Sequence, residues 1–166
     1  MTHLTFRMKK TLLATLLIVI MAFSAQAQSS RHSYTTALGV KAYPTGVTLK
    51  HFMTPNTAVE GIAYFYNYGF RVTALYEIHG NFSSTPGLKW YIGPGVHAGF
   101  WNTAWKDRYP GRENGVTLGI DGVLGLDYKF NNVPINMSLD WQPSINLTGY
   151  GGFDGGWGGL AVRYTF

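Results

Sequence analysis

The stretch INMSLDWQPSINLT (residues 135–148) alternates apolar and polar side chains over fourteen positions. Apolar residues stand at the odd-numbered positions and polar ones at the even-numbered positions. This period of two is that of a β-strand, whose successive side chains point to opposite faces. Strands in globular proteins are usually about five or six residues long. A strand of this length raises the question of which face meets which surroundings, since a soluble sheet buries its apolar face and a membrane barrel turns it outward.

The start of the chain has the pattern of an export signal. Three cations precede an apolar run at residues 11–23, and the motif AQA (residues 25–27) supplies a small-x-small cleavage site. These features predict a secretory signal peptide over residues 1–27, cleaved before Gln28. An uncleaved membrane anchor is the alternative, but the apolar run is short for a spanning helix. Residues 28–166 then form one domain.

Charge and cysteine content exclude several classes of protein. Three of the thirteen cations lie in the signal peptide, so the mature chain has ten cations against eight acids, a net charge of +2. This small excess argues against nucleic acid as a partner. The chain has no cysteine, which excludes a disulfide scaffold and thiolate metal sites. No motif indicates a cofactor or a metal, and none is predicted.

Turn signals divide the mature chain into short extended runs. We expect eight strands and no helix after the signal peptide. The strands are predicted at residues 34–43, 47–53, 57–66, 69–79, 87–101, 115–130, 134–148 and 157–166. An even number of antiparallel strands joined in chain order is typical of an up-and-down barrel, which has no open edge.

The charged residues decide which way this barrel faces. Every charge in a predicted strand lies on the polar face: Lys41, Lys50, Glu60, Arg71, Glu77, Lys89, Asp121, Asp127, Lys129, Asp140 and Arg163. A soluble, lipocalin-like barrel would have to pack the large apolar residues into an interior that eight strands make only just wide enough for side chains. Glycines on the polar face also suit a narrow lumen. We therefore predict an all-β, eight-stranded transmembrane β-barrel with its charges inside.

The interior charges have two interpretations. Six cations and five acids are nearly balanced, and buried charges are tolerated when they are paired. The balance favours a salt-bridge network that closes the lumen, and the alternative is an ion or proton path. His79 and His97 are expected to face inward as members of this network. Aromatic residues near the predicted strand ends fit the girdles of a membrane barrel: Tyr34, Tyr43, Trp101, Phe130, Trp157 and Phe166.

The longest link, residues 102–114, mixes aromatic and charged side chains. With both chain ends in the periplasm, the strand count places this link outside the cell. It is a candidate surface for lipopolysaccharide phosphate or an envelope protein, through Trp105, Lys106, Arg108, Tyr109 and Arg112. A solvated loop without a partner is the alternative. The glycine-rich segment 149–156 is predicted to be a second outer loop.

Three stretches resemble a known family. LKWYIGPGVHAGFW (88–101), LGIDGVLGLDYKFNNVPINMSLDWQPSINL (118–147) and LAVRYTF (160–166) are similar to small outer-membrane β-barrels of Gram-negative bacteria, of the OmpA/OmpX-type architecture. Val162, Tyr164 and the terminal Phe166 resemble the carboxy-terminal signal that barrel-insertion machinery reads. The resemblance implies location in the cell outer membrane, contact with its lipid and lipopolysaccharide, and the fold, but little about activity.

The sequence therefore favours a structural or interaction role at the cell envelope. A narrow channel and a lipid A-modifying enzyme are the alternatives. Enzymes of that kind use histidine with serine and an acid, and the inward-facing Ser138 and Asp140 are candidates. The sequence has no His-x-Ser pair. We therefore predict no catalytic residues.

Overall fold

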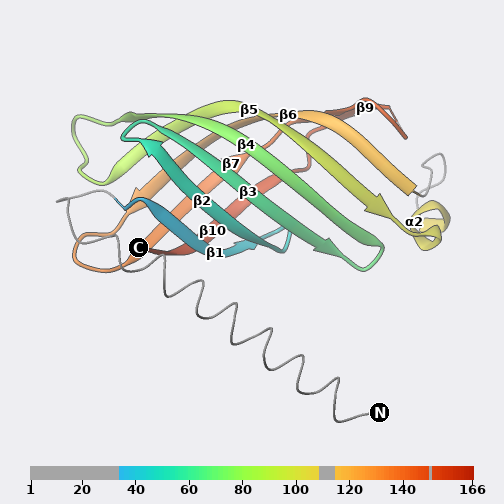
Figure 1. Cartoon of the computed structure of the whole chain (residues 1–166), viewed down its shortest axis with the longest axis horizontal. Helices are drawn as coiled ribbons and strands as arrows, with labels where there is room; N and C mark the ends of the chain where they lie inside the picture. Colours follow the sequence, from blue (N-terminus) through green and yellow to red (C-terminus); the bar gives the residue numbers. More distant parts are fainter. Residues whose placement is uncertain (1–33, 109–114, 150) are drawn as a thin grey trace, which may run out of the picture.

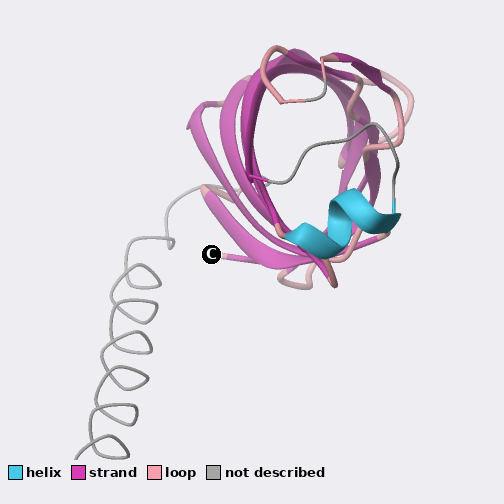
Figure 2. Ribbon diagram, turned by 90° about the vertical axis from the view of Figure 1, so that its right-hand side faces the viewer, coloured by secondary structure: helices cyan, strands magenta, loops and turns pink. Residues whose placement is uncertain are grey.

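The chain forms a closed antiparallel β-barrel in the computed structural model (Figures 1 and 2). The structure describes residues 34–108, 115–149 and 151–166. The predicted signal peptide lies outside these residues, so its cleavage stays a prediction. No helix in the described part of the chain has the length and apolar character needed to span a bilayer.

Ten strand segments occupy eight positions around the barrel. They are β1 (Thr36–Ala42), β2 (Gly46–Thr54), β3 (Thr57–Tyr66), β4 (Gly69–Asn81), β5 (Leu88–Trp101), β6 (Gly115–Lys129), β7 (Ile135–Trp141), β8 (Ser144–Asn146), β9 (Gly152–Asp154) and β10 (Gly158–Thr165). β7 and β8 both pair with β6 and together form the seventh position. β10 pairs with β7 and β9 pairs with β8, and these two segments form the eighth position. β1 pairs with both β2 and β10, which closes the ring. The predicted all-β barrel of eight antiparallel strands is confirmed.

The decisive stretch is interrupted where it contains a proline. Strand structure stops after Trp141 and resumes at Ser144. Pro143 has no N–H to donate to the ladder, so pairing is broken locally. The Pro143 carbonyl still accepts a hydrogen bond from the Gly122 N–H, at 2.8 Å. The prediction of one unbroken strand over 134–148 was therefore wrong at this point, while its direction and its faces are as predicted.

Two elements were not predicted. The helix α2 (Thr103–Arg108) follows β5, within the segment expected to be an irregular loop. The Asn102 side chain caps it by accepting a hydrogen bond from the Trp105 N–H at 3.3 Å. β9 lies within the glycine-rich segment predicted as a loop, and its three residues pair only with β8. Both elements are too short to produce a readable period.

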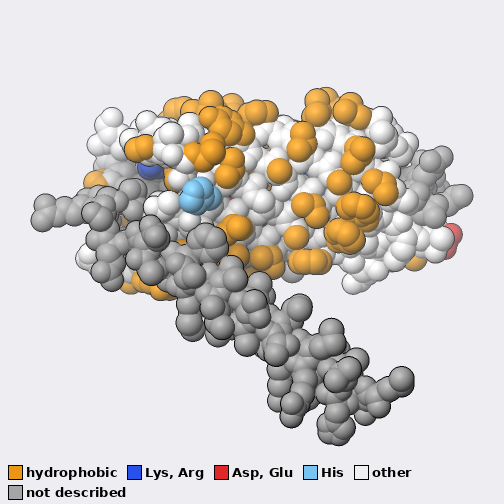
Figure 3. Space-filling model, in the orientation of Figure 1, with side chains coloured by type: hydrophobic (Ala, Val, Ile, Leu, Met, Phe, Trp, Pro, Cys, Tyr) orange, Lys and Arg blue, Asp and Glu red, His pale blue; other side chains and the backbone are white. Residues whose placement is uncertain are grey.

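The faces of the barrel are inverted relative to those of a soluble protein. Polar side chains alternate inward along the strands, and apolar ones face outward. The outer wall exposes large apolar residues on every long strand, among them Val72, Val96, Leu124, Leu139 and Trp141, which are 44%, 57%, 53%, 58% and 50% exposed. Figure 3 shows one face of the barrel, on which hydrophobic side chains are spread along the length of the wall and Lys, Arg, Asp and Glu side chains are visible only near the two ends.

The lumen is narrow enough to require glycine at some positions. A Cβ atom on Gly125 would lie 2.5 Å from Cζ of Tyr91 on the neighbouring strand β5. A Cβ atom on Gly119 would collide with the imidazole of His97. Glycine at these positions leaves room for a long side chain on the neighbouring strand. The glycines on the polar face therefore suit a narrow lumen, as predicted.

Candidate functional site

The lumen holds most of the predicted charged residues. Nine of them are buried: Lys41, Lys50, Glu60, Arg71, Glu77, Asp121, Asp127, Asp140 and Arg163. Each of the four buried cations contacts at least one carboxylate. Buried charges cost several kcal/mol each unless they are paired in this way. The arrangement fits a network that fills the barrel.

The largest group of charges surrounds Lys50 on β2. Its ammonium lies 2.8 Å from Glu77, 3.2 Å from Glu60 and 3.5 Å from Asp127. It therefore ties together carboxylates from β3, β4 and β6. Because all four side chains are almost fully buried, water does not screen these contacts.

Arg163 on β10 completes this group. Its Nη2 donates to Glu60 Oε1 at 2.5 Å, and its Nη1 donates to Ser138 at 2.8 Å and Asn136 at 3.1 Å. Its Nε donates to the hydroxyl of Thr48 at 3.1 Å. The guanidinium thus links β10 to three other strands across the lumen. Charge-assisted hydrogen bonds of this kind are about twice as strong as neutral ones.

A second group forms around Asp140 on β7. Lys41 Nζ lies 2.6 Å from its carboxylate, and the Tyr91 hydroxyl donates to it at 2.8 Å. The Gln142 amide also donates to Asp140, at 2.9 Å, and accepts from the Tyr64 hydroxyl at 2.8 Å. The candidate catalytic pair is thereby occupied, since Ser138 accepts from Arg163 and Asp140 binds Lys41.

The third group contains Arg71, Asp121 and His97. Arg71 and Asp121 form an ion pair, and His97 Nδ1 lies 2.9 Å from the other Asp121 oxygen. The second buried histidine, His79, instead contacts Glu77 at 2.8 Å. The two histidines therefore belong to different groups. Within the described residues, no three histidine or acidic side chains are placed to hold a metal ion.

Two of the predicted network residues lie elsewhere. Lys89 donates to the backbone carbonyl of Pro55 at 2.9 Å. Lys129 donates to the carbonyls of Phe130 and Val133, at 2.8 and 2.6 Å. Both stand near strand ends, where a long lysine side chain can reach water at the rim. The prediction that they join the buried network was wrong. The buried charges are consequently four cations against five acids, instead of six against five.

An aromatic cluster closes the end of the lumen next to α2. The ring of Trp157 lies 5.2 Å from Tyr64 and 5.6 Å from Tyr66, and Tyr66 lies 5.9 Å from Trp101. The Arg71 guanidinium stacks over Trp157 at 3.8 Å, which joins the cluster to the charge network. Figure 2 shows α2 at one side of this opening.

Three of the predicted girdle residues are turned inward. Trp101 and Trp157 are each at most 7% exposed and belong to this cluster, and Tyr34 donates its hydroxyl to Asp127. Placing them on the outer surface was wrong, because their nearness to a strand end was given more weight than the face they occupy. Trp101 shares its face with His97 and Gly99, which the alternation does indicate. Tyr43, at 87% exposed, does face outward.

The predicted binding surface at 102–114 is only partly described. Trp105, expected on the surface, is 7% exposed and stacks on Trp101 with ring centroids 4.2 Å apart. Arg108 is exposed. Tyr109, Arg112 and the side chain of Lys106 lie outside the described residues. Trp105 was misplaced because no local sequence pattern indicates that its ring stacks on Trp101.

Replacing Trp105 with alanine should release α2 from the barrel. The change removes an aromatic stack worth about 0.5–1.5 kcal/mol beyond the apolar area that it buries. We expect trypsin to cleave after Lys106 and Arg108 at least several times faster, as followed by mass spectrometry. Trp90→Ala, on the outer wall, is the control and should leave the cleavage rate unchanged. Equal rates in all three proteins would show that the stack does not hold α2.

The carboxy-terminal residues lie on the outside of the last strand. Val162 and Tyr164 are 40% and 59% exposed on the wall. Phe166 exchanges backbone hydrogen bonds with Thr36, at 2.9 and 3.0 Å, which ties the end of the chain to β1. Reading of these residues by insertion machinery stays a prediction.

The fold and the lumen define a class: a closed eight-stranded antiparallel barrel with paired charges inside and apolar residues outside. No family model, curated protein or solved structure matches the chain.

Proposed function

We propose that this chain is an outer-membrane β-barrel protein of a Gram-negative cell envelope, with a closed lumen and a structural or interaction role. The inverted sidedness carries the proposal. A wall of exposed valine, leucine, isoleucine and aromatic side chains is costly in water, and its natural solvent is the hydrocarbon of a bilayer. Closure of the strand ring pairs the backbone N–H and C=O groups of the strands, which is necessary in a bilayer because hydrocarbon offers no hydrogen-bond partners.

The closed lumen favours this role over that of a channel. Nine buried charges, their hydrogen-bonding partners and the aromatic cluster occupy the interior. A water-filled pore requires many more strands. The buried groups that a lipid A-modifying enzyme would use are engaged in structural contacts, as described above for Ser138 and Asp140.

The proposed topology follows from the two ends of the barrel. Tyr34, where the described part of the chain begins, lies at the same end of the barrel as Phe166 and the turn at 130–134, and we propose that this end faces the periplasm. α2 and residues 147–149 lie at the other end, which we propose is the outer one, where lipopolysaccharide or an envelope protein would make contact. The resemblance to OmpA/OmpX-type barrels, a predicted signal peptide and the terminal Phe166 support export and insertion by the barrel machinery.

Cell fractionation and gel mobility test this proposal together. We expect the mature protein in the outer-membrane fraction, beginning at Gln28. A folded barrel should migrate faster on a gel before boiling than after it. Recovery as a folded monomer in detergent-free buffer would overturn the membrane assignment.

A further inference from the structure

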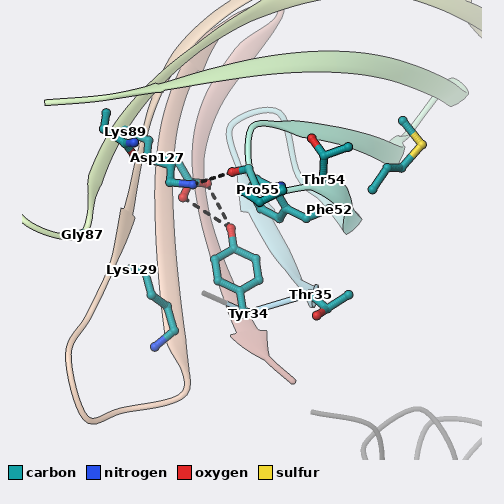
Figure 4. A pocket seen from close by; sticks show the side chains of 11 residues that line it. Tyr34, Thr35, Phe52, Thr54, Pro55, Gly87, Lys89, Asp127 and Lys129 are labelled. Carbon is teal, nitrogen blue, oxygen red and sulfur yellow. Dashed lines mark hydrogen bonds between the residues drawn. The ribbon is translucent and has the colours of Figure 1, made fainter. Parts of the chain in front are cut away.

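The barrel end that holds Tyr34 and Phe166 contains a cavity of about 480 Å³. Its walls come from residues before β1, from the β2–β3 turn and from the facing ends of β5 and β6. Figure 4 shows Lys89 reaching toward the Pro55 carbonyl, with Tyr34 below and its hydroxyl directed at Asp127. We call this cavity, lined by Tyr34, Phe52, Pro55, Lys89, Asp127 and Lys129 among others, the terminal cavity.

The terminal cavity has more unused hydrogen-bond donors than unused acceptors. An ammonium group has three donors. Lys89 uses one of its donors on Pro55, whereas Lys129 points away from Lys89 (Figure 4) and uses two on the carbonyls of the turn after β6. Within the described residues, no carboxylate lies within ion-pair distance of either lysine, whereas every buried cation has one. Positive charge and free donors therefore remain at the cavity.

The acceptors in the cavity are already used. The Asp127 carboxylate accepts from the Asn136 amide at 2.7 Å and from the Tyr34 hydroxyl at 3.3 Å, and it lies 3.5 Å from Lys50. Burial and the adjacent Asp127 raise the pKa of the Tyr34 phenol, so this hydroxyl stays protonated and continues to donate. A cationic ligand would find Asp127 occupied, whereas an anion would find unused donors.

One wall of the cavity is aromatic. The rings of Phe52 and Tyr34 meet edge to face, with centroids 5.1 Å apart, and Lys89 Nζ lies 5.2 Å from the Phe52 centroid. Met53 and Pro55 continue this apolar surface. A pocket that combines an apolar wall with a few convergent polar groups is the usual form of a small-molecule site.

We propose that the terminal cavity binds a small organic carboxylate, whose anionic group is held by Lys89 and whose apolar part lies against Phe52 and Tyr34. Binding exchanges the neutral Pro55 carbonyl for a charged acceptor, and such hydrogen bonds are stronger. A monoanion suits the cavity better than a phosphate dianion, because Asp127 lines the same space. The inference does not depend on where in the cell the protein resides.

Titration with 2-naphthoate tests this site in the full-length mature protein, folded in an uncharged detergent. We expect saturable shifts of the backbone amide signals of Thr54, Gly87 and Lys89 in nuclear magnetic resonance spectra. The neutral 2-naphthamide should bind at least about tenfold more weakly, because it lacks the negative charge. It also controls for partition of the aromatic ring into detergent.

Variants assign the binding to Lys89. Lys89→Gln should lose at least about tenfold in affinity for 2-naphthoate. Lys129→Gln removes the same charge from a side chain that points away from Lys89 (Figure 4) and should bind nearly as the unaltered protein does. Heat-modified gel mobility checks that each variant is folded. The proposal is overturned if 2-naphthoate causes no shifts at the terminal cavity, if 2-naphthamide binds equally well, or if Lys89→Gln retains full affinity.

Discussion

Replacing Arg163 with methionine is expected to destabilise the barrel by about 3–5 kcal/mol, the usual cost of breaking a buried ion pair by removing one partner. Methionine fills much of the volume but leaves Glu60 without its 2.5 Å contact. Three neutral side chains on β2 and β7 also lose their donor. Urea unfolding of the protein in lipid vesicles, followed by gel mobility, measures the change.

A second substitution separates the ion pair from the loss of packing. Glu60→Gln combined with Arg163→Met removes both charges, so the double variant should be more stable than the sum of the single effects predicts. Asp107→Asn, an exposed control, should change stability by less than about 0.5 kcal/mol. A cost below about 1 kcal/mol for Arg163→Met would mean that water enters the lumen and that the network does not close it.

Placing arginine on the outer wall should be costly only if the wall faces lipid. Leu124 is 53% exposed on β6, between Ile92 of β5 and Trp141 of β7. In a bilayer, Leu124→Arg should destabilise the barrel by about 2–4 kcal/mol, the range for arginine near the midplane. In water, the same change at an exposed position would have almost no cost. Urea unfolding in vesicles measures the difference.

Val133→Arg is the matched control for Leu124→Arg. Val133 lies in the turn between β6 and β7 at the rim and is 43% exposed. Arginine at the interface should cost only about 0–1 kcal/mol. If the two variants are equally stable, the middle of the wall and its rim have the same surroundings, and the bilayer assignment fails.

The alternation of side chains made the barrel predictable from the sequence. The pattern at 135–148 identifies its faces, and the charges from Lys41 to Arg163 mark the lumen. This reasoning works because a strand has a fixed period of two, so a single residue known to be inside assigns the whole strand.

The sequence was less informative where the chain leaves this period. Trp105 belongs to a six-residue helix, and its contact with Trp101 depends on how α2 turns back over the barrel. β9 is glycine-rich and gains its strand structure from pairing with β8. Lys89 and Lys129 follow the strand alternation, but their long side chains end at the rim. Such contacts arise from tertiary structure and leave no local pattern.

Quenching of single tryptophans by brominated lipid tests the sidedness of the barrel most directly. Trp141 is 50% exposed on the wall, whereas Trp157, in the segment hydrogen-bonded to Gln142, is 7% exposed and inside. Each is kept alone, with the other four tryptophans replaced by phenylalanine, in vesicles whose acyl chains carry bromine. The account predicts strong quenching of Trp141 and little quenching of Trp157. If Trp141 fluorescence is not quenched by the brominated chains but is quenched by iodide in the surrounding water, the account is contradicted.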